Sequence, residues 1–177
     1  MTTVAVEVVY RGIYQRTLAR NIVRAIVFAA RKEGKIGTAF GRYGDSPERN
    51  GIPAKQFGYI TDTPEELEEI AAQYEPKQVD VSICADDTLT QGLESWAWTG
   101  LQPINAVTKP GGTLIMTSNN SSEALVKQMH RRDTPYKLSI LKGGASFAGL
   151  FVAVQVGLGA IQVADGDMLV DSDLQQE

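Results

Sequence analysis

The strongest chemical signal near the start of the chain is a group of arginines. Arg16, Arg20 and Arg24 recur at the four-residue spacing of one helix face, and Arg11 precedes them. Arginine binds phosphate or carboxylate through paired hydrogen bonds, and a helix N-terminus favours anions. The pattern therefore indicates one of three things: a small anionic ligand, an acidic partner surface, or a solvated helix face.

A second candidate lies in the middle of the chain. Asp86 and Asp87 follow the apolar run 79–85, which is typical of a central parallel strand. Open α/β sheets bind ligands at the carboxyl ends of such strands. With no histidine or metal ligand nearby in sequence, we expect these aspartates to cap a helix or shape a turn. Cys84, inside the same run, reads as a small buried hydrophobe.

Several catalytic classes are excluded by what the chain lacks. The only histidine, His130, stands beside Arg131 and Arg132 and is expected at the surface, without clustered metal ligands. One cysteine allows no intrachain disulfide and cannot alone hold an iron–sulfur cluster. The sequence contains neither a Gly-x-Ser-x-Gly turn nor a Walker-type loop. These features count against a self-contained hydrolase or metalloenzyme.

Composition is that of an ordinary soluble globular protein. The 177 residues are 43% hydrophobic and 21% charged, with a net charge of -4. The absence of a basic surplus argues against general nucleic-acid binding. No apolar run approaches the roughly 20 residues of a membrane span, and the N-terminus does not read as a secretion signal. We therefore expect a cytoplasmic protein that contacts neither nucleic acid nor membrane.

The elements that must position these groups begin with a strand at 4–9, a turn at 10–16 and a helix at 17–32. An apolar stripe defines the buried helix face, and Gly34 is its expected stop. The stripe consists of Leu18, Ile22, Ile26 and Ala29. A nucleotide fold opens in this way, but its glycine-rich phosphate turn is represented here by Gly12 alone.

Further elements alternate between strand and helix. We expect strands at 36–40, 54–60, 79–85, 113–117 and 136–141, and helices after Thr63, after 118–122 and over 144–163. Thr63, Pro64 and Glu66 form a capping-box start for a helix that buries Leu67, Ile70 and Ala71. The loop 41–53 is long and polar, which is typical of a functional or mobile segment.

This alternation predicts an α/β fold with an open, mainly parallel sheet and helices on both faces, a Rossmann-like architecture. Residues 1–163 are expected to form a single domain. The acidic segment 164–177 is expected to be an exposed C-terminal tail.

The order of several short motifs resembles one known family across residues 3–163. These motifs are Arg11-Gly12, Glu33-Gly34-Lys35, Tyr43-Gly44, Glu48-Arg49-Asn50-Gly51, Thr61-Asp62, Asp86-Asp87-Thr88-Leu89 and Lys109-Pro110-Gly111-Gly112-Thr113-Leu114-Ile115. Together they are similar to the gamma subunit of 2-oxoacid:acceptor oxidoreductases, the pyruvate:ferredoxin oxidoreductase group. The family's first turn reads Gly-Arg-Gly-Gly-Gln-Gly, and in this chain only Arg11, Gly12 and Gln15 match it.

The resemblance implies a non-catalytic subunit of a complex that oxidatively decarboxylates a 2-oxoacid, commonly forming an acyl-coenzyme A. Thiamine diphosphate, Mg2+ and 4Fe–4S clusters would lie on the alpha, beta and ferredoxin-like partner subunits, and this chain alone would bind no cofactor. The residues expected to face coenzyme A or a partner subunit are Tyr10, Arg11, Gly12, Tyr43, Gly44 and Arg49.

The alternative is a stand-alone α/β protein that binds a nucleotide or another small molecule. A Rossmann-like methyltransferase is one form of it, because Lys109-Pro110-Gly111-Gly112 before a strand resembles a turn of those enzymes.

Overall fold

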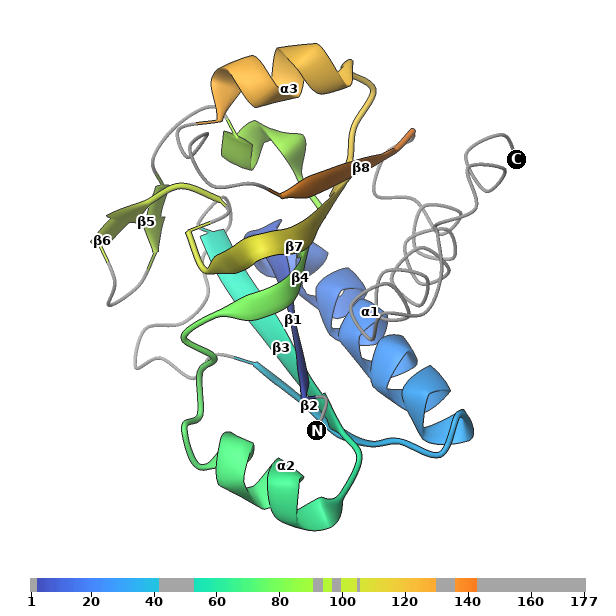
Figure 1. Ribbon diagram of the computed structural model, residues 1–177. Helices are drawn as coiled ribbons and strands as arrows, with labels where there is room; N and C mark the ends of the chain where they lie inside the picture. Colours follow the sequence, from blue (N-terminus) through green and yellow to red (C-terminus); the bar gives the residue numbers. More distant parts are fainter. Residues whose placement is uncertain are drawn as a thin grey trace.

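The computed structural model of the chain describes residues 3–41, 53–90, 94–96, 100–104, 106–129 and 136–142. Its helices are α1 (Ile13–Lys32), α2 (Pro64–Ala71) and α3 (Ser122–Gln128), with a 3-10 turn η1 (Asp87–Thr90). Its strands are β1 (Val4–Arg11), β2 (Ile36–Gly41), β3 (Pro53–Thr61), β4 (Val79–Cys84), β5 (Glu94–Trp96), β6 (Gly100–Gln102), β7 (Thr108–Thr117) and β8 (Lys137–Leu141). Figure 1 shows these elements arranged around one twisted sheet.

The main sheet has six strands in the order β2-β3-β1-β4-β7-β8. The pairs β1–β4, β4–β7 and β7–β8 are parallel, whereas β3 is antiparallel to both of its neighbours, β1 and β2. Among the described strands of this sheet, β3 alone therefore runs against the common direction. The predicted open and mainly parallel α/β sheet is confirmed.

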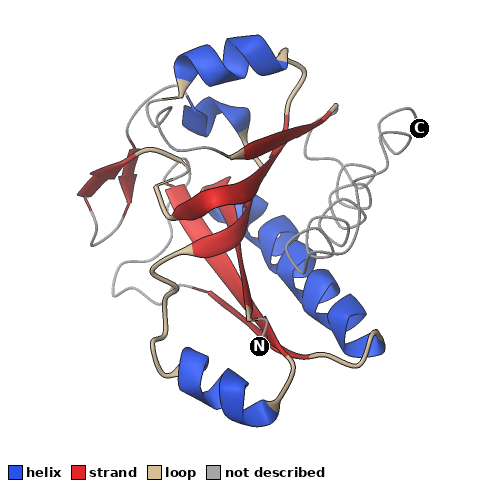
Figure 2. Ribbon diagram, in the orientation of Figure 1, coloured by secondary structure: helices blue, strands red, loops and turns tan. Residues whose placement is uncertain are grey.

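Helices cover both faces of this sheet, as predicted (Figure 2). Because side chains alternate along a strand, Val8 and Val9 of β1 point to opposite faces. Val8 joins the apolar cluster under α1, whereas Val9 joins a second cluster with Leu125 of α3. Ala5, on the Val9 side, belongs to a third cluster against which α2 packs. The faces are called below the α1 face and the α2/α3 face.

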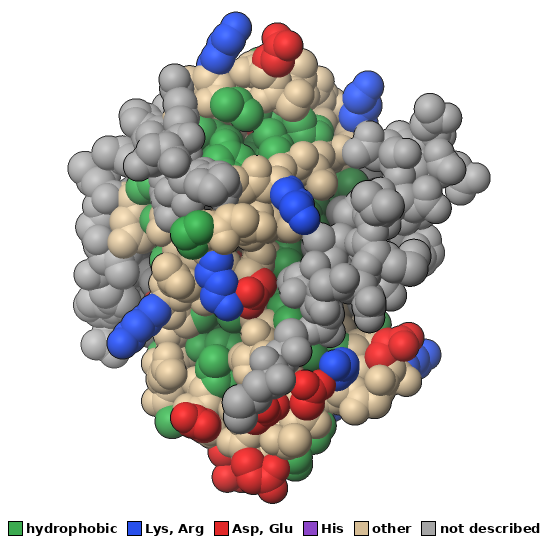
Figure 3. All heavy atoms as spheres, in the orientation of Figure 1, with side chains coloured by type: hydrophobic (Ala, Val, Ile, Leu, Met, Phe, Trp, Pro, Cys, Tyr) green, Lys and Arg blue, Asp and Glu red, His purple; other side chains and the backbone are tan. Residues whose placement is uncertain are grey.

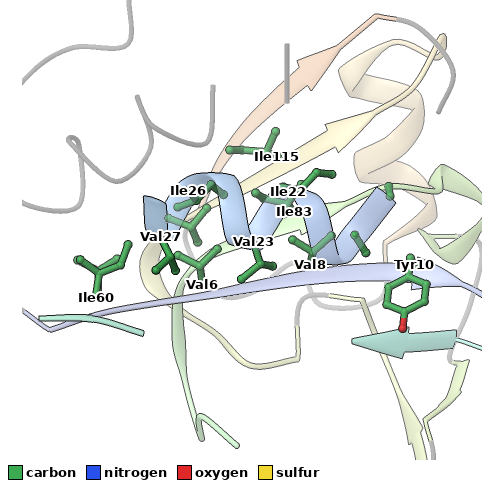
Figure 4. Packing of buried hydrophobic residues seen from close by; sticks show 14 of the residues in the cluster. Val6, Val8, Tyr10, Ile22, Val23, Ile26, Val27, Ile60, Ile83 and Ile115 are labelled. Atoms are coloured by element: carbon green, nitrogen blue, oxygen red, sulfur yellow. The ribbon is translucent and has the colours of Figure 1, made fainter. Parts of the chain in front are cut away.

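The α1 face is closed by a wide apolar stripe of the helix. Figure 4 shows Ile22, Val23, Ile26 and Val27 pointing at the β1, β3 and β4 side chains. Gly58 of β3 allows this close packing, since a Cβ there would lie 3.0 Å from Val23 Cγ1. The observed stripe is broader than the predicted one: Leu18 and Ala29 are half-buried at its margins, and Ala19 and Ala30 are inside it. Burying this apolar surface is the main stabilising contribution of α1.

The α2/α3 face contains a buried ion pair. Lys55 Nζ of β3 lies 2.9 Å from Glu7 Oε2 of β1, and these side chains are 4% and 0% exposed. Ser82 Oγ donates to the other carboxylate oxygen, Glu7 Oε1, at 2.7 Å. Ser82 Oγ and Thr108 Oγ1 are also hydrogen-bonded, 2.9 Å apart. Four residues from β1, β3, β4 and β7 thus form one polar network inside the protein.

Helix α2 begins as its sequence predicts. Thr63 Oγ1 accepts from Glu66 N at 3.3 Å, and Glu66 Oε2 accepts from Thr63 N at 3.4 Å, which completes a capping box. Leu67 and Ile70 are half-buried against the sheet, but Ala71 is exposed, so the observed buried face of α2 is narrower than the predicted one. Figure 3 shows acidic side chains gathered over this end of the molecule.

Several sequence-based boundaries shift. α1 begins at Ile13 rather than Thr17, because the chain turns at Gly12 alone. The segment 109–112, predicted as a turn, lies within β7, where the register against β4 shifts and Gly111 has φ 78°. The β5–β6 hairpin was not predicted.

Several predictions lie outside the described residues: the helix at 144–163, the tail 164–177, the surface position of His130 and most of the loop 41–53. Within the described part of the chain, no helix is both long and apolar enough to cross a bilayer.

Candidate functional site at the carboxyl edge of the sheet

The topology identifies one place where a ligand or partner would be expected. The chain leaves β1 through α1 toward β2, on one side of the sheet, and leaves β4 toward β7, on the other side. The carboxyl ends of the neighbouring strands β1 and β4 are therefore a topological switch point. Open α/β sheets bind ligands in the crevice at such a point. Arg11 ends β1 here, and Asp86 follows β4.

The connection from β1 to α1 is a single residue. Gly12 has φ 74° and ψ 177°, a conformation essentially restricted to glycine. The third residue of the helix, Gln15, folds back so that its Oε1 accepts from Arg11 N at 2.8 Å. A seven-residue turn was predicted from the sequence, and the observed turn is much tighter. It leaves no wide loop of backbone amides to wrap a phosphate.

Asp86 ties this turn to the end of β4. Its Oδ2 accepts from Gln15 Nε2 at 2.8 Å, and its Oδ1 accepts from Thr88 N at 3.0 Å and Thr88 Oγ1 at 2.5 Å. Arg11 Nε in turn donates to Thr88 Oγ1 at 3.0 Å. The predicted turn-shaping role of Asp86 is what the structure shows. The carboxyl ends of β1 and β4 are thus joined by the chain's own hydrogen bonds.

These contacts define the charge of Asp86. Burial alone would raise the pKa of Asp86, but hydrogen bonds from Thr88 and Gln15 and the positive charge of Arg11 outweigh burial and hold that pKa below its usual range. The first turn of α1 contains no acidic residue of its own. The Asp86 carboxylate, bonded to Gln15 in that turn, supplies the negative charge that a helix N-terminus favours.

The polar network continues to the next strand. Asp87 Oδ2 accepts from Ser118 Oγ at the end of β7 and from Asn120 Nδ2, the latter at 3.1 Å. Asn120 N donates to Ser118 Oγ at 3.0 Å. Side chains from the ends of three parallel strands, β1, β4 and β7, therefore meet along one edge.

Cys84 lies beneath this edge and is unsuited to chemistry there. It is fully buried, and its Sγ donates to the Asp86 carbonyl oxygen at 3.0 Å. Burial raises the pKa of the Cys84 thiol far above its ordinary value, so the reactive thiolate is not populated near neutral pH. The predicted buried role of Cys84 is confirmed.

Arg11 supplies a positively charged group at this edge. Across the described ranges, no group of three or more His, Cys, Asp or Glu side chains could hold a metal ion. Arg11 is half-buried and held in place by Thr88, which presents a fixed guanidinium beside the turn. A fixed guanidinium can bind a carboxylate or a carbonyl group of a partner with defined geometry.

The six residues predicted to face a ligand or partner have different places. Arg11 and Gly12 lie at the switch point. Tyr10 is fully buried on the α1 face, and its Oη accepts from Gln56 Nε2 at 3.3 Å, so it supports the turn from within the protein. Tyr43, Gly44 and Arg49 lie outside the described residues and stay predictions.

Sequence reasoning missed the partners of Arg11. Gln15 and Thr88 complete the site through two long-range contacts, since Gln15 and Asp86 are 71 residues apart and Arg11 and Thr88 are 77 apart. The one available signal was that Asp86 follows a buried strand in a fold whose ligands bind at carboxyl ends.

No protein-family model matches this chain. Two solved structures are similar to it over nearly its whole length. The pyruvate oxidoreductase subunit PORC from Thermotoga maritima shares 20% identity, with a TM-score of 0.56 over 99% of this chain and 82% of that one. The keto/oxoacid ferredoxin oxidoreductase gamma subunit from Geobacter sulfurreducens shares 16% identity, with a TM-score of 0.52 over 99% of this chain and 91% of that one. The chain therefore has the fold of these oxidoreductase subunits, in agreement with the resemblance found in its sequence.

Proposed function

We propose that this chain is the gamma subunit of a multi-subunit 2-oxoacid:acceptor oxidoreductase that oxidatively decarboxylates a 2-oxoacid. The observation that carries the proposal is the fold shared with two subunits of such enzymes over 99% of this chain. The order of the sequence motifs supports the same family independently of the fold.

In this proposal the chain assembles the complex, and catalysis takes place on other subunits. Thiamine diphosphate, Mg2+ and the iron–sulfur clusters belong to the alpha, beta and ferredoxin-like subunits. A cluster needs several thiolates, whereas this chain has one cysteine, which is buried and bonded to the Asp86 carbonyl oxygen.

The first turn does not fit the diphosphate of coenzyme A. The Gln15–Asp86 hydrogen bond of 2.8 Å joins the carboxyl ends of β1 and β4, and Asp86, whose pKa is lowered further below its usual range, is ionised near neutral pH. A phosphate bound at the N-terminus of α1 would lie beside this carboxylate, and the two negative charges would repel each other. We therefore propose that Arg11 and Gly12 face a partner subunit and that any coenzyme A contact lies elsewhere.

Co-expression with tagged alpha, beta and ferredoxin-like subunits tests the proposal. We expect native mass spectrometry to show this chain in the complex, and 2-oxoacid-dependent reduction of the acceptor to require it. A chain that stays monomeric beside those subunits, or that turns over substrate alone, would overturn the proposal. A saturable nucleotide ligand for the isolated chain, measured by calorimetry, would favour a stand-alone binding protein instead.

Two substitutions then separate interface from ligand contact. Arg11→Ala should weaken assembly and leave the KM for coenzyme A unchanged, whereas Arg20→Ala, an equal charge change on the exposed side of α1, should leave assembly intact. Intact assembly of Arg11→Ala with a raised KM for coenzyme A would contradict the interface role.

A further inference from the structure

A groove on the far side of α1 is not used by the proposed function. It lies between α1 and the edge strand β2 and has a volume of about 550 Å³. Arg24, Phe28 and Arg31 line it from the helix, and Thr38 and Ala39 line it from the strand. In the described sheet, β2 pairs only with β3, so its other edge has no neighbouring strand.

The groove combines an apolar floor with positive ends. Phe28 is 61% exposed, and Lys32 Nζ lies 5.0 Å from the centroid of its ring, which adds a positive charge beside the apolar surface. Arg24 and Arg31 are seven residues apart, about two helical turns or roughly 10 Å along the helix. Arg31 is held at the groove because its Nη2 donates to the Gly37 carbonyl oxygen at 2.6 Å. The complementary occupant is an extended segment with an apolar centre and acidic flanks.

The chain itself contains such a segment near its C-terminus. Met168, Leu169 and Val170 stand between Asp165 and Asp167 on one side and Asp171 and Asp173 on the other, and residues 164–177 include no lysine or arginine. From Asp167 to Asp171 an extended chain spans roughly 13 Å. This span is close to the separation of the two arginines.

The intervening chain is long enough for this contact. Leu141, at the end of β8, belongs to the apolar cluster under α1, so the chain leaves the described residues at the α1 face. From β8 to β2 the sheet spans five strand spacings, roughly 24 Å. Residues 143–164 cover roughly 33 Å even when helical.

We propose that the segment Asp165–Asp173 binds in this groove beside β2, with its aspartates at Arg24 and Arg31 and its apolar residues against the side of Phe28 that Lys32 leaves open. The segment predicted as an exposed tail would then cover the basic side of α1. This proposal does not depend on the proposed function, since it concerns contacts within one chain.

Cross-linking of the full chain tests the proposal. Ala39→Cys with Leu169→Cys places one thiol on each side of the expected contact, since Ala39 lines the groove and packs on the α1 face, and the native Cys84 is fully buried and protected. We expect a short bismaleimide to give an intrachain product whose yield is independent of protein concentration. A product found only as a cross-linked dimer would overturn the proposal, because a second copy would then fill the groove.

Charge reversal makes the test specific. Arg24→Glu should lower the intrachain yield about fivefold, and adding Arg31→Glu, Asp167→Arg and Asp171→Arg to the same chain should restore it, because both charge pairs are then reversed. Arg20→Glu, one turn earlier on α1 and outside the groove, is the matched control and should leave the yield unchanged. Thermal unfolding confirms that each variant is folded. An equal yield for Arg24→Glu and the parent would contradict the proposal.

Discussion

The two faces of the sheet are built on different principles, although the same strands make both. On β1, Val6 and Val8 point into an apolar cluster under α1, whereas Glu7 between them points to the opposite face and pairs with Lys55. Apolar packing tolerates many combinations of side chains of similar volume. An ion pair with defined hydrogen bonds accepts far fewer. We therefore expect apolar packing on both faces to supply stability and the ion pair on the α2/α3 face to specify strand alignment.

The energetic terms of the two faces differ accordingly. Removing two charges from water costs several kcal/mol per ion, which mutual attraction and further hydrogen bonds must offset. Here Lys55 and Ser82 each bind a different oxygen of Glu7, and Thr108 is bonded to Ser82. The pair is therefore a weak source of net stability, but losing one partner is costly.

The largest effect should follow from breaking this pair. Lys55→Met leaves the buried Glu7 carboxylate without its counter-ion, which should lower the free energy of unfolding by about 3–5 kcal/mol. Urea unfolding followed by circular dichroism at pH 7 measures the loss. Lys35→Met is the control, because its 2.7 Å pair with Asp62 is 33% and 39% exposed and should contribute only about 0–1 kcal/mol.

A second variant sharpens the same comparison. Glu7→Leu with Lys55→Met replaces the pair by apolar side chains and should return stability to within about 1 kcal/mol of the parent. Strand alignment can then be followed by amide hydrogen exchange across β1 and β3. A double variant as unstable as Lys55→Met alone would mean that the α2/α3 face depends on the pair for stability.

On the α1 face, Ile26→Ala should cost about 2–4 kcal/mol, through lost burial and the cavity that remains. Ile26 is 1% exposed and packs within the cluster of Figure 4. Phe28→Ala, on the exposed side of the same helix, should cost much less in the same urea titration. Equal losses for Ile26→Ala and Phe28→Ala would show that the buried side of α1 contributes no more to stability than its exposed side.

The smallest expected effect is the pH dependence of stability that Asp86 contributes at the carboxyl edge of the sheet. The folded pKa of Asp86 is lowered, so its contribution to stability is present above the unfolded value of about 3.9 and is lost as pH falls through the folded pKa. Asp86→Asn should therefore flatten the acid limb of a stability-against-pH curve. An unchanged limb between about pH 2 and 4 would contradict this assignment.

The features that were predictable from sequence are those encoded by neighbouring residues. The α2 cap was readable because Thr63, Pro64 and Glu66 carry all its chemistry, and Gly34 ends α1 with φ 82° as expected. The start of α1 was missed because no side chain caps it. The helix begins there because the backbone turns at Gly12, whose conformation the sequence pattern did not reveal.

What could not be predicted depends on residues far apart in the chain. Three such features are the reversed direction of β3, the Glu7–Lys55 pair and the Gln15–Asp86 hydrogen bond. The residues in these contacts are up to 71 positions apart in the sequence. Arg11 and Gly12 were identified as site residues from the family resemblance, and Arg11 also from the basic helix start, but Asp86 was identified only as a turn residue. Its hydrogen bonds could be assigned only once strand order was known.

The buried ion pair also has a consequence for how the chain folds during synthesis. Glu7 and Lys55 both lie within residues 4–61, which hold β1, α1, β2 and β3, whereas Ser82 lies 75 residues after Glu7. The first three strands and α1 can therefore assemble while the pair is still hydrated on the uncovered face. Docking of β4 beside β1 would then bury a pair that has already formed, which avoids burying either charge alone.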